Sequence, residues 1–267
     1  MLKLAISGKG GVGKTTLSSL LARAYAARGH HVLAIDANPD ANFGTALGIP
    51  YEEIQKITPI AEMSTLIEER TGAKPGTAAP FFKLNPKVDD IPDRFSVEKD
   101  GVKLLMLGTV ESGGAGCICP ESTLLRALLS HLILRRDETV ILDMDAGVEH
   151  LARGTVRAVD AFIVVAEPGQ RSIQTAKSVK KLAADLGVRK TYVVGNKITG
   201  PQDEQYIRDN LSDFEVLGYL SNDPQVREAD FKGESPYDLA PNAVAEVTRI
   251  IERLEKIQGA GDGKADD

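Results

Sequence analysis

A glycine-rich segment near the N-terminus most constrains what this chain can fold into. Residues 7–16 read SGKGGVGKTT and stand between an apolar run and a helical pattern. Gly8 and Gly13 frame the spacing G-x-x-x-x-G-K-T. Glycines let backbone N–H groups approach phosphate oxygens closely, and the N-terminus of a helix adds a favourable dipole. A chance glycine turn is the alternative, but the flanking strand and helix and the Lys-Thr pair favour a phosphate-binding loop.

The loop predicts binding of a nucleoside triphosphate with Mg²⁺. We expect Lys14 to reach the β- and γ-phosphates and the Thr15 hydroxyl to ligate Mg²⁺. The residues expected to surround the phosphates are Gly10, Gly11, Val12, Gly13, Lys14, Thr15 and Thr16.

The rest of the chain alternates apolar runs with helical patterns, which is typical of βαβ units around a parallel sheet. The apolar runs predict strands at Leu2–Ile6, Val32–Ile35, Lys103–Leu107, Thr139–Leu142, Ala161–Val165, Thr191–Val194 and Glu215–Tyr219. Helices are predicted over Thr16–Arg28, Glu121–Arg135, Ser172–Leu186 and Asn242–Ile257. The predicted fold is α/β: a single P-loop domain over residues 1–258, whose mostly parallel central sheet has helices on both faces.

Two stretches depart from this pattern. Residues 71–100 contain four prolines with little periodicity, which predicts a long loop or an insertion. Gly259–Asp267 is rich in glycine and acidic residues, so we expect a disordered tail.

Composition narrows the classes of partner. The 267 residues carry a formal charge of −6, which argues against nonspecific nucleic-acid binding because that needs a basic face. No apolar run approaches the roughly 20 residues that span a bilayer, and the N-terminus does not read as a signal peptide. We therefore expect a cytoplasmic protein without nucleic-acid or membrane partners. The two cysteines, Cys117 and Cys119, are too few for a disulfide framework.

Lys9, inside the phosphate loop, makes the chain resemble the deviant Walker A ATPases. These include the nitrogenase iron protein, the Min and Par positioning ATPases and metal-maturation factors. The resemblance implies Mg²⁺-dependent ATP hydrolysis by a homodimer. It also implies that Lys9 crosses the dimer interface to the partner's nucleotide, where its charge stabilises the transferring phosphate.

Two segments after predicted strands resemble the switches of that family. Asp36 to Asp40 resembles switch I, which implies that Asp36 assists the metal and Asp40 orients the attacking water. A simple turn or helix cap is the alternative for Asp40. Leu142 to Gly147 resembles Walker B with switch II, which implies that Asp143 holds Mg²⁺ through water and that the Gly147 N–H senses the γ-phosphate.

Two shorter matches suggest contacts to the base. Asn196 and Lys197 end a predicted strand where the family places an adenine-contacting asparagine. The segment Ser221–Val226, with Pro224, resembles the loop that closes over the base and ribose. An ordinary turn at the end of a strand explains both matches nearly as well.

The cysteines stand two apart in a glycine-rich segment, before Pro120 and a predicted helix. Thiols near a helix N-terminus ionise readily, and thiolates bind soft or borderline metals. Two thiolates are half a tetrahedral site, so a dimer would supply four ligands for Ni²⁺, Zn²⁺ or a cluster. The alternatives are two buried, incidental cysteines, or a strained disulfide between them.

The pair of cysteines together with the deviant loop resembles the CooC group, the nickel-maturation ATPases of carbon monoxide dehydrogenase and its relatives. The runs Asp143–His150 and Val165–Gly169 also resemble segments of that group. The resemblance implies ATP-dependent delivery of nickel to such a client enzyme.

Two other classes compete with nickel delivery. An electron-transfer protein like the nitrogenase iron protein uses two cysteines far apart in sequence, one near switch II, where this chain has Asp145. A Min-type positioning ATPase needs a C-terminal amphipathic membrane helix. Here the apolar stripe from Val244 to Ile257 has helical core spacing, its polar face mixes acidic and basic residues, and an acidic tail follows it.

Overall fold

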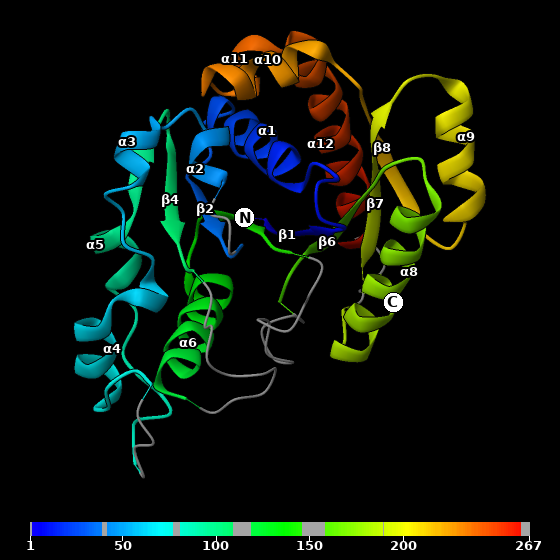
Figure 1. Cartoon of the computed structure of the whole chain (residues 1–267). Helices are drawn as coiled ribbons and strands as arrows, with labels where there is room; N and C mark the ends of the chain where they lie inside the picture. Colours follow the sequence, from blue (N-terminus) through cyan, green and yellow to red (C-terminus); the bar gives the residue numbers. More distant parts are fainter. Residues whose placement is uncertain are drawn as a thin grey trace.

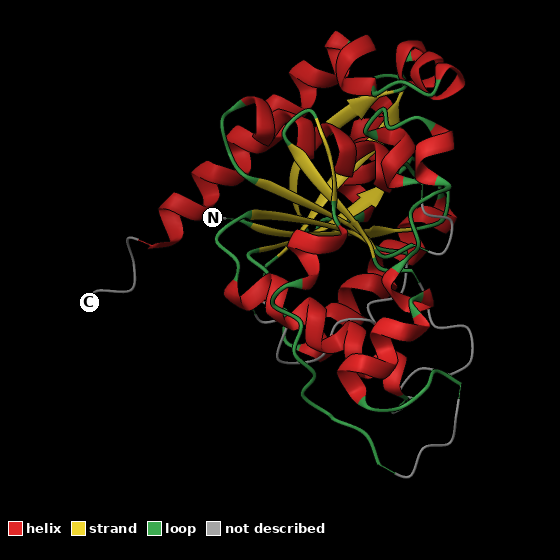
Figure 2. Cartoon of the chain, turned by 90° about the vertical axis from the view of Figure 1, so that its left-hand side faces the viewer, coloured by secondary structure: helices red, strands yellow, loops and turns green. Residues whose placement is uncertain are grey.

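The computed structural model describes residues 2–38, 42–76, 81–108, 119–145, 158–188 and 190–262. Its centre is an eight-stranded sheet with helices packed on both faces (Figures 1 and 2), which confirms the predicted α/β fold. The strands are β1 (Lys3–Gly8), β2 (Val32–Asp36), β3 (Val97–Lys99), β4 (Val102–Met106), β5 (Thr139–Asp143), β6 (Ala161–Ala166), β7 (Thr191–Ile198) and β8 (Glu215–Ser221).

The sheet order is β3-β4-β2-β5-β1-β6-β7-β8. Every neighbouring pair is parallel except β3 and β4. Strands β1, β2, β5 and β6 are buried along their whole length. Continuous burial explains why they read as unbroken apolar runs, because both faces of a parallel sheet are covered.

The helices are α1 (Lys14–Ala27), α2 (Phe43–Ala46), α3 (Tyr51–Ile54), α4 (Ser64–Thr71), α5 (Ile91–Phe95), α6 (Pro120–Arg135), α8 (Gln170–Leu186), α9 (Pro201–Asn210), α10 (Pro224–Lys232), α11 (Pro236–Leu239) and α12 (Pro241–Asp262). The single-turn 3₁₀ helix η1 spans Ile60–Glu62.

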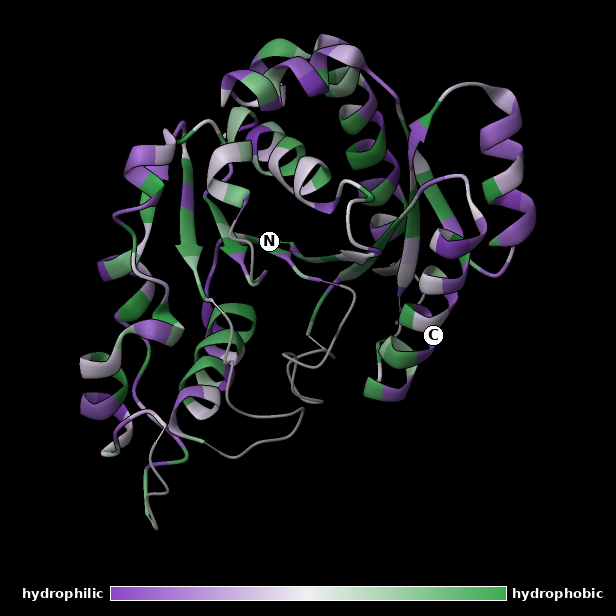
Figure 3. Cartoon of the chain, viewed as in Figure 1, coloured by the Kyte–Doolittle hydropathy of each residue, from purple (hydrophilic) through white to green (hydrophobic). Residues whose placement is uncertain are grey.

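Each face of the sheet has its own hydrophobic core. Leu4 and Ile6 of β1 belong to the core with α1 and α12, whereas Ala5 belongs to the core with α4, α6 and α8. This alternation follows from the two-residue period of a strand. Figure 3 shows strands that are mainly hydrophobic and helices that alternate between hydrophobic and hydrophilic residues.

The apolar stripe of α12 packs on the chain's own sheet. Val247, Ile250, Ile251 and Leu254 are at most 1% exposed. Val244 and Ile257 are partly buried against the same core. None of the helices in the described ranges is long and apolar enough to cross a membrane.

The range 71–100, predicted as a loop or insertion, contains regular structure. Helix α5 and strand β3 lie within it, and β3 pairs antiparallel with β4. Asp100 and Gly101 join the two strands with φ angles of 48° and 77°, the conformation of a tight hairpin turn. The Asp-Gly dipeptide is a recognised hairpin signal, but the surrounding prolines dominated the sequence pattern. At the other end, α12 continues to Asp262, past the predicted domain boundary.

Candidate nucleotide site

The phosphate loop connects β1 to α1, as the sequence predicts. Strand β1 ends at Gly8 and helix α1 begins at Lys14. Gly13, the residue before the helix, has φ 95°, and a Cβ there would lie 2.0 Å from Nδ2 of Asn196. Only glycine therefore fits at this position, because an L-residue would be strained and would clash.

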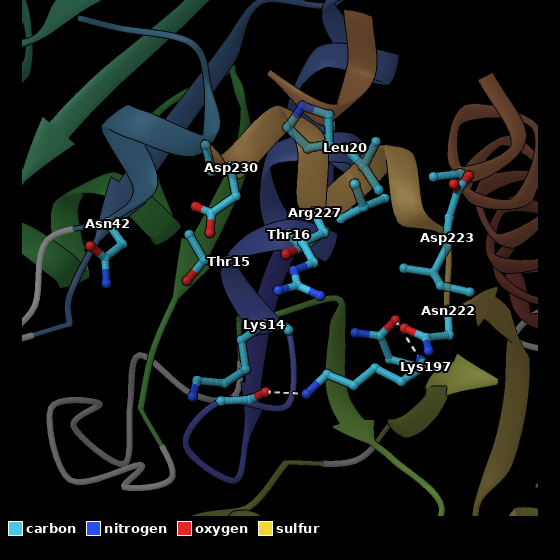
Figure 4. Close-up of a pocket in the computed structure, with 18 of the residues that line it drawn as sticks. Lys14, Thr15, Thr16, Leu20, Asn42, Lys197, Asn222, Asp223, Arg227 and Asp230 are labelled. Carbon is cyan, nitrogen blue, oxygen red and sulfur yellow. Dashed lines mark hydrogen bonds between the residues drawn. The ribbon is translucent and has the colours of Figure 1, made fainter. Parts of the chain in front are cut away.

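A cavity of about 910 Å³ lies between the phosphate loop, the ends of β7 and β8, and helix α10 (Figure 4). Its volume is within the range of small-molecule sites. Eight of the predicted site residues line it: Gly10, Gly11, Gly13, Lys14, Thr15, Thr16, Asn196 and Lys197. Residues from two distant parts of the chain, the phosphate loop and the end of β7, thus meet at one opening.

Besides Lys9, four described residues that were predicted for the nucleotide site lie beside the cavity rather than in its wall. Val12 is fully buried, and its carbonyl accepts a hydrogen bond from Nδ2 of Asn196 at 2.7 Å. Pro224 is the first residue of α10 and does not line the cavity, whereas Asp223 and Val226 do. Asp36 and Asp143 are buried beneath the loop at the ends of β2 and β5.

The Asp143 carboxylate accepts hydrogen bonds from three polar side chains. Its Oδ2 accepts hydrogen bonds from Thr15 Oγ1 at 2.7 Å and from Asn38 Nδ2 at 2.8 Å, and its Oδ1 accepts one from Ser18 Oγ at 3.2 Å. Burial raises the pKa of Asp143 to about 7; the Thr15 hydrogen bond opposes this shift and the charge of Asp36 adds to it. A buried carboxylate beside a hydroxyl and a second carboxylate fits a hard divalent cation such as Mg²⁺, which prefers oxygen ligands.

Asp36 organises the segment that follows β2. Its carboxylate accepts the backbone N–H of Asn38 at 3.0 Å and that of Phe43 at 2.9 Å. Asp36 also stands opposite Asp143 in the register of β2 and β5. Its predicted assistance to the metal stays a prediction.

Sequence reasoning missed Glu167, which lies just after β6. Its carboxylate contacts two predicted site residues, Lys9 Nζ at 3.2 Å and Lys197 Nζ at 3.1 Å. Lys197 Nζ also donates to the carbonyl of Gly11 at 2.7 Å, so its side chain lies along the phosphate loop. The available signal was an acidic residue directly after a buried strand that neighbours β1.

Helix α10 supplies the wall opposite the loop. Asp223 caps this helix by accepting the Gln225 N–H at 2.8 Å. Arg227 and Asp230, one turn apart, line the cavity and were not predicted. The sequence signal for them was their i, i+3 spacing after a proline that opens a helix.

Several predicted residues lie outside the described ranges: Asp40, Gly147 and Cys117. Cys119 is described and stands at the N-cap of α6, which begins at Pro120, one residue before the predicted start at Glu121. Its half-buried Sγ lies 3.1 Å from Ser122 Oγ. Among the described residues, no three His, Cys, Asp or Glu side chains gather closely enough to hold a metal ion.

Comparison with known proteins agrees with this geometry. A family model described as the CobQ/CobB/MinD/ParA nucleotide binding domain matches residues 3–237. The chain belongs to this nucleotide-binding family. The match covers the phosphate loop, both predicted switches and the α10 wall, and it confirms membership of the deviant Walker A ATPases.

The similarity to individual relatives extends over the whole chain. The carbon monoxide dehydrogenase accessory protein CooC of Rhodospirillum rubrum is 46% identical over 262 residues, which are 97% of this chain and 99% of that protein. An uncharacterised ATP-binding protein of Methanocaldococcus jannaschii is 44% identical over 96% of this chain and 99% of its own length. The predicted resemblance to the CooC group is confirmed.

Solved structures confirm the fold. The MinC:MinD complex of Aquifex aeolicus matches with a TM-score of 0.69 at 21% identity, over 96% of both chains. MinD of Pyrococcus horikoshii in complex with Mg-ADP matches with a TM-score of 0.66 at 20% identity, over 97% of this chain and 98% of that one.

Proposed function

We propose that this chain is an ATP-hydrolysing homodimeric metallochaperone. In this proposal it binds nickel through Cys117 and Cys119 and assists nickel insertion into carbon monoxide dehydrogenase or a related enzyme. The observation that carries the proposal is the 46% identity to a carbon monoxide dehydrogenase accessory protein over nearly the full length of both chains. The position of Cys119 directly before α6 supports it, because cysteine sulfur is a ligand for soft and borderline metals such as Ni²⁺.

The nucleotide end of the mechanism uses the residues of the cavity. Lys14 and the loop N–H groups bind the phosphates, and Asn196 with its neighbours faces the base. Thr15 and Asp143 would hold Mg²⁺, which neutralises charge on the β- and γ-phosphates. Asp40 orients the attacking water, and Lys9 of each subunit contributes its charge to the nucleotide of the other.

The metal end uses four thiolates. Cys117 and Cys119 of one subunit supply two ligands, and the same residues of the second subunit complete a tetrahedral set. Ni²⁺ is the cargo that the relative implies. Thiolate ligands accept Zn²⁺ as well.

One helix and one strand connect the proposed metal site to the nucleotide site. Helix α6 starts beside Cys119 and leads directly into β5, which ends at Asp143. Because the chain runs along α6 and returns along β5, Cys119 and Asp143 lie toward the same end of this helix–strand unit. In this proposal, a movement of Asp143 at the end of β5 is transmitted to Cys119 through β5 and α6.

A positioning ATPase is the second candidate, favoured by the likeness to the MinD fold. Burial of the α12 stripe against the sheet disfavours membrane attachment through that helix. An electron-transfer ATPase like the nitrogenase iron protein is a third alternative, and metal content distinguishes it because it would hold iron.

The deciding experiment measures Ni²⁺, Zn²⁺ and iron per subunit together with mass in solution. Wild type and the double variant Cys117→Ser, Cys119→Ser are compared without nucleotide, with ADP and with a nonhydrolysable ATP analogue. Ser122→Ala is the matched control, because it changes a neighbour of Cys119 Sγ and keeps both thiols.

We expect about one nickel or zinc per two subunits, lost in the double variant, retained in Ser122→Ala and altered by nucleotide. Nickel activation of the client enzyme should fail with the double variant. Absence of cysteine-dependent metal in every nucleotide state would contradict the metallochaperone proposal and favour a positioning ATPase.

A further inference from the structure

Helix α10 places a cation in the nucleotide cavity, opposite the phosphate loop. Arg227 lines the cavity together with Thr16 of α1 and Asn222 at the end of β8. Figure 4 shows the Arg227 guanidinium pointing into the cavity. The phosphate loop and Lys14 provide the binding groups on the other side.

Arg227 has one oriented contact before any ligand binds. Its guanidinium carbon lies 5.2 Å from the ring centroid of Phe231, one helical turn further along α10. Phe231 is 77% exposed, which is unusual for a large apolar side chain. A cation–π contact with Arg227 gives this exposed ring a role, because the ring restricts the guanidinium to one side of the helix.

The charge of Arg227 is not neutralised by the chain itself within the described ranges. No described carboxylate forms an ion pair with Arg227, whereas Lys232 on the same helix pairs with Glu228 at 2.7 Å. Asp230 and Glu234 line the same cavity, but neither forms an ion pair with Arg227. A cavity guanidinium that forms no ion pair with a described carboxylate is suited to bind an anion from solution. Its planar fork of N–H donors matches a phosphate group.

The neighbours of Arg227 indicate which phosphate it meets. Lys14 and the loop account for the β- and γ-phosphates at one end of the cavity. Asn222 lies across the cavity from Lys14 (Figure 4), toward the end where the base is expected. The α-phosphate connects these two ends, and Thr16 and Arg227 line the cavity between them.

We propose that Arg227 is a nucleotide-binding residue whose guanidinium binds the α-phosphate from the side opposite the loop. Phe231 is its positioning residue. This assignment rests on the proposed binding of ATP in the cavity, and it adds a contact that ADP and ATP share. Arg227 therefore contributes to holding the nucleotide before and after hydrolysis.

The test measures the affinity of ADP and of a nonhydrolysable ATP analogue by calorimetric titration. We expect Arg227→Gln to lose affinity for both nucleotides by the same factor, roughly ten- to a hundredfold, as for loss of a charge-assisted hydrogen bond. Arg227→Lys should recover part of the loss. Phe231→Leu should weaken both nucleotides by a smaller factor, and Lys232→Ala, on the same helix but outside the cavity wall, should bind as wild type does.

Thermal unfolding of each variant shows that the fold is retained, which is expected for substitutions on an exposed helix. Unchanged affinity of Arg227→Gln for both nucleotides would overturn the assignment and leave ATP binding intact. Loss of affinity for the ATP analogue alone would overturn it as well, because that result indicates a γ-phosphate contact. A wild-type protein that binds neither nucleotide would overturn the proposed function together with this assignment.

Discussion

Lys9 Nζ lies 3.2 Å from Glu167 Oε1, so the signature lysine of the phosphate loop is bound within its own subunit. The other oxygen of the same carboxylate, Oε2, forms an ion pair with Lys197 Nζ. Lys197 Nζ also donates a hydrogen bond to the carbonyl of Gly11. Glu167 thereby ties two points of the loop to the end of β6. In the proposed dimer, Lys9 must leave Glu167 before it can reach the nucleotide of the second subunit.

Glu167→Gln should release Lys9. The side chains of Lys9 and Glu167 are 36% and 23% exposed, so their ion pair is weak, about 1 kcal/mol or less, and easily exchanged. We expect faster acetylation of Lys9 in the nucleotide-free variant, measured by mass spectrometry, and dimer formation with an ATP analogue at lower protein concentration. Asp213→Asn, which removes the remote partner of Lys180, is the control and should change neither property. Equal acetylation of Lys9 in wild type and Glu167→Gln would contradict the release.

The two lysines of the loop should differ in what they contribute. Lys14→Ala should abolish ATP binding, because Lys14 lines the cavity at the phosphate end. Lys9→Ala should bind ATP normally, because Lys9 points to Glu167 and not into the cavity. It should lose hydrolysis, because the charge that Lys9 is proposed to contribute to the second subunit's nucleotide is removed. Nucleotide affinity and phosphate release, measured on the same preparations, separate the two outcomes. Full hydrolysis by Lys9→Ala would contradict the role proposed for Lys9.

Glycine substitutions in the loop should show how closely Asn196 approaches it. Gly13→Ala requires φ 95° from an L-residue and brings a Cβ to 2.0 Å from Nδ2 of Asn196. We expect a loss of stability of roughly 2–3 kcal/mol, from the strained backbone and from the hydrogen bond between Asn196 and Val12, together with weaker ATP binding.

Gly10→Ala is the matched control for Gly13→Ala. A Cβ at Gly10 meets no atom within 4 Å, and its φ is not positive, so thermal stability should change little. Comparable destabilisation by both substitutions would show that the contact with Asn196 is unimportant.

The stability of the metal-free protein should depend on the protonation of Asp143. Its pKa of about 7 in the folded chain lies above the reference value of 3.8, so the folded state retains a proton that the unfolded state has released. The stability from this carboxyl is therefore complete below about pH 4 and is lost as the pH rises to about 7.

Asp143→Asn should remove this dependence. We expect urea unfolding in EDTA to show a smaller loss of stability between pH 4 and pH 7 for Asp143→Asn than for wild type. The exposed Asp137→Asn is the control and should follow wild type. Mg²⁺ at pH 8 should stabilise wild type more than Asp143→Asn, since the ionised carboxylate attracts the cation. Parallel pH profiles for wild type and Asp143→Asn would contradict the shift.

Much of the fold follows from short stretches of sequence. The β1–loop–α1 unit was predictable because its glycines, its lysine and its apolar strand are adjacent in the chain and act locally. The buried strands were predictable because a strand covered on both faces must be apolar throughout. The hairpin of β3 and β4 carries a local signal as well, the Asp100-Gly101 turn, but the prolines of that region obscured it.

The sequence by itself determined the chemistry of the phosphate loop and the family to which it belongs. Only the tertiary structure decided which distant side chains serve that loop. Glu167 is 158 positions from Lys9, and Asn196 is 184 positions from Val12. Arg227 lies on a helix that forms the opposite wall of the same cavity. These relationships arise because strands β1, β6 and β7 lie side by side in the sheet, an order set by the packing of the whole domain and not by neighbouring residues.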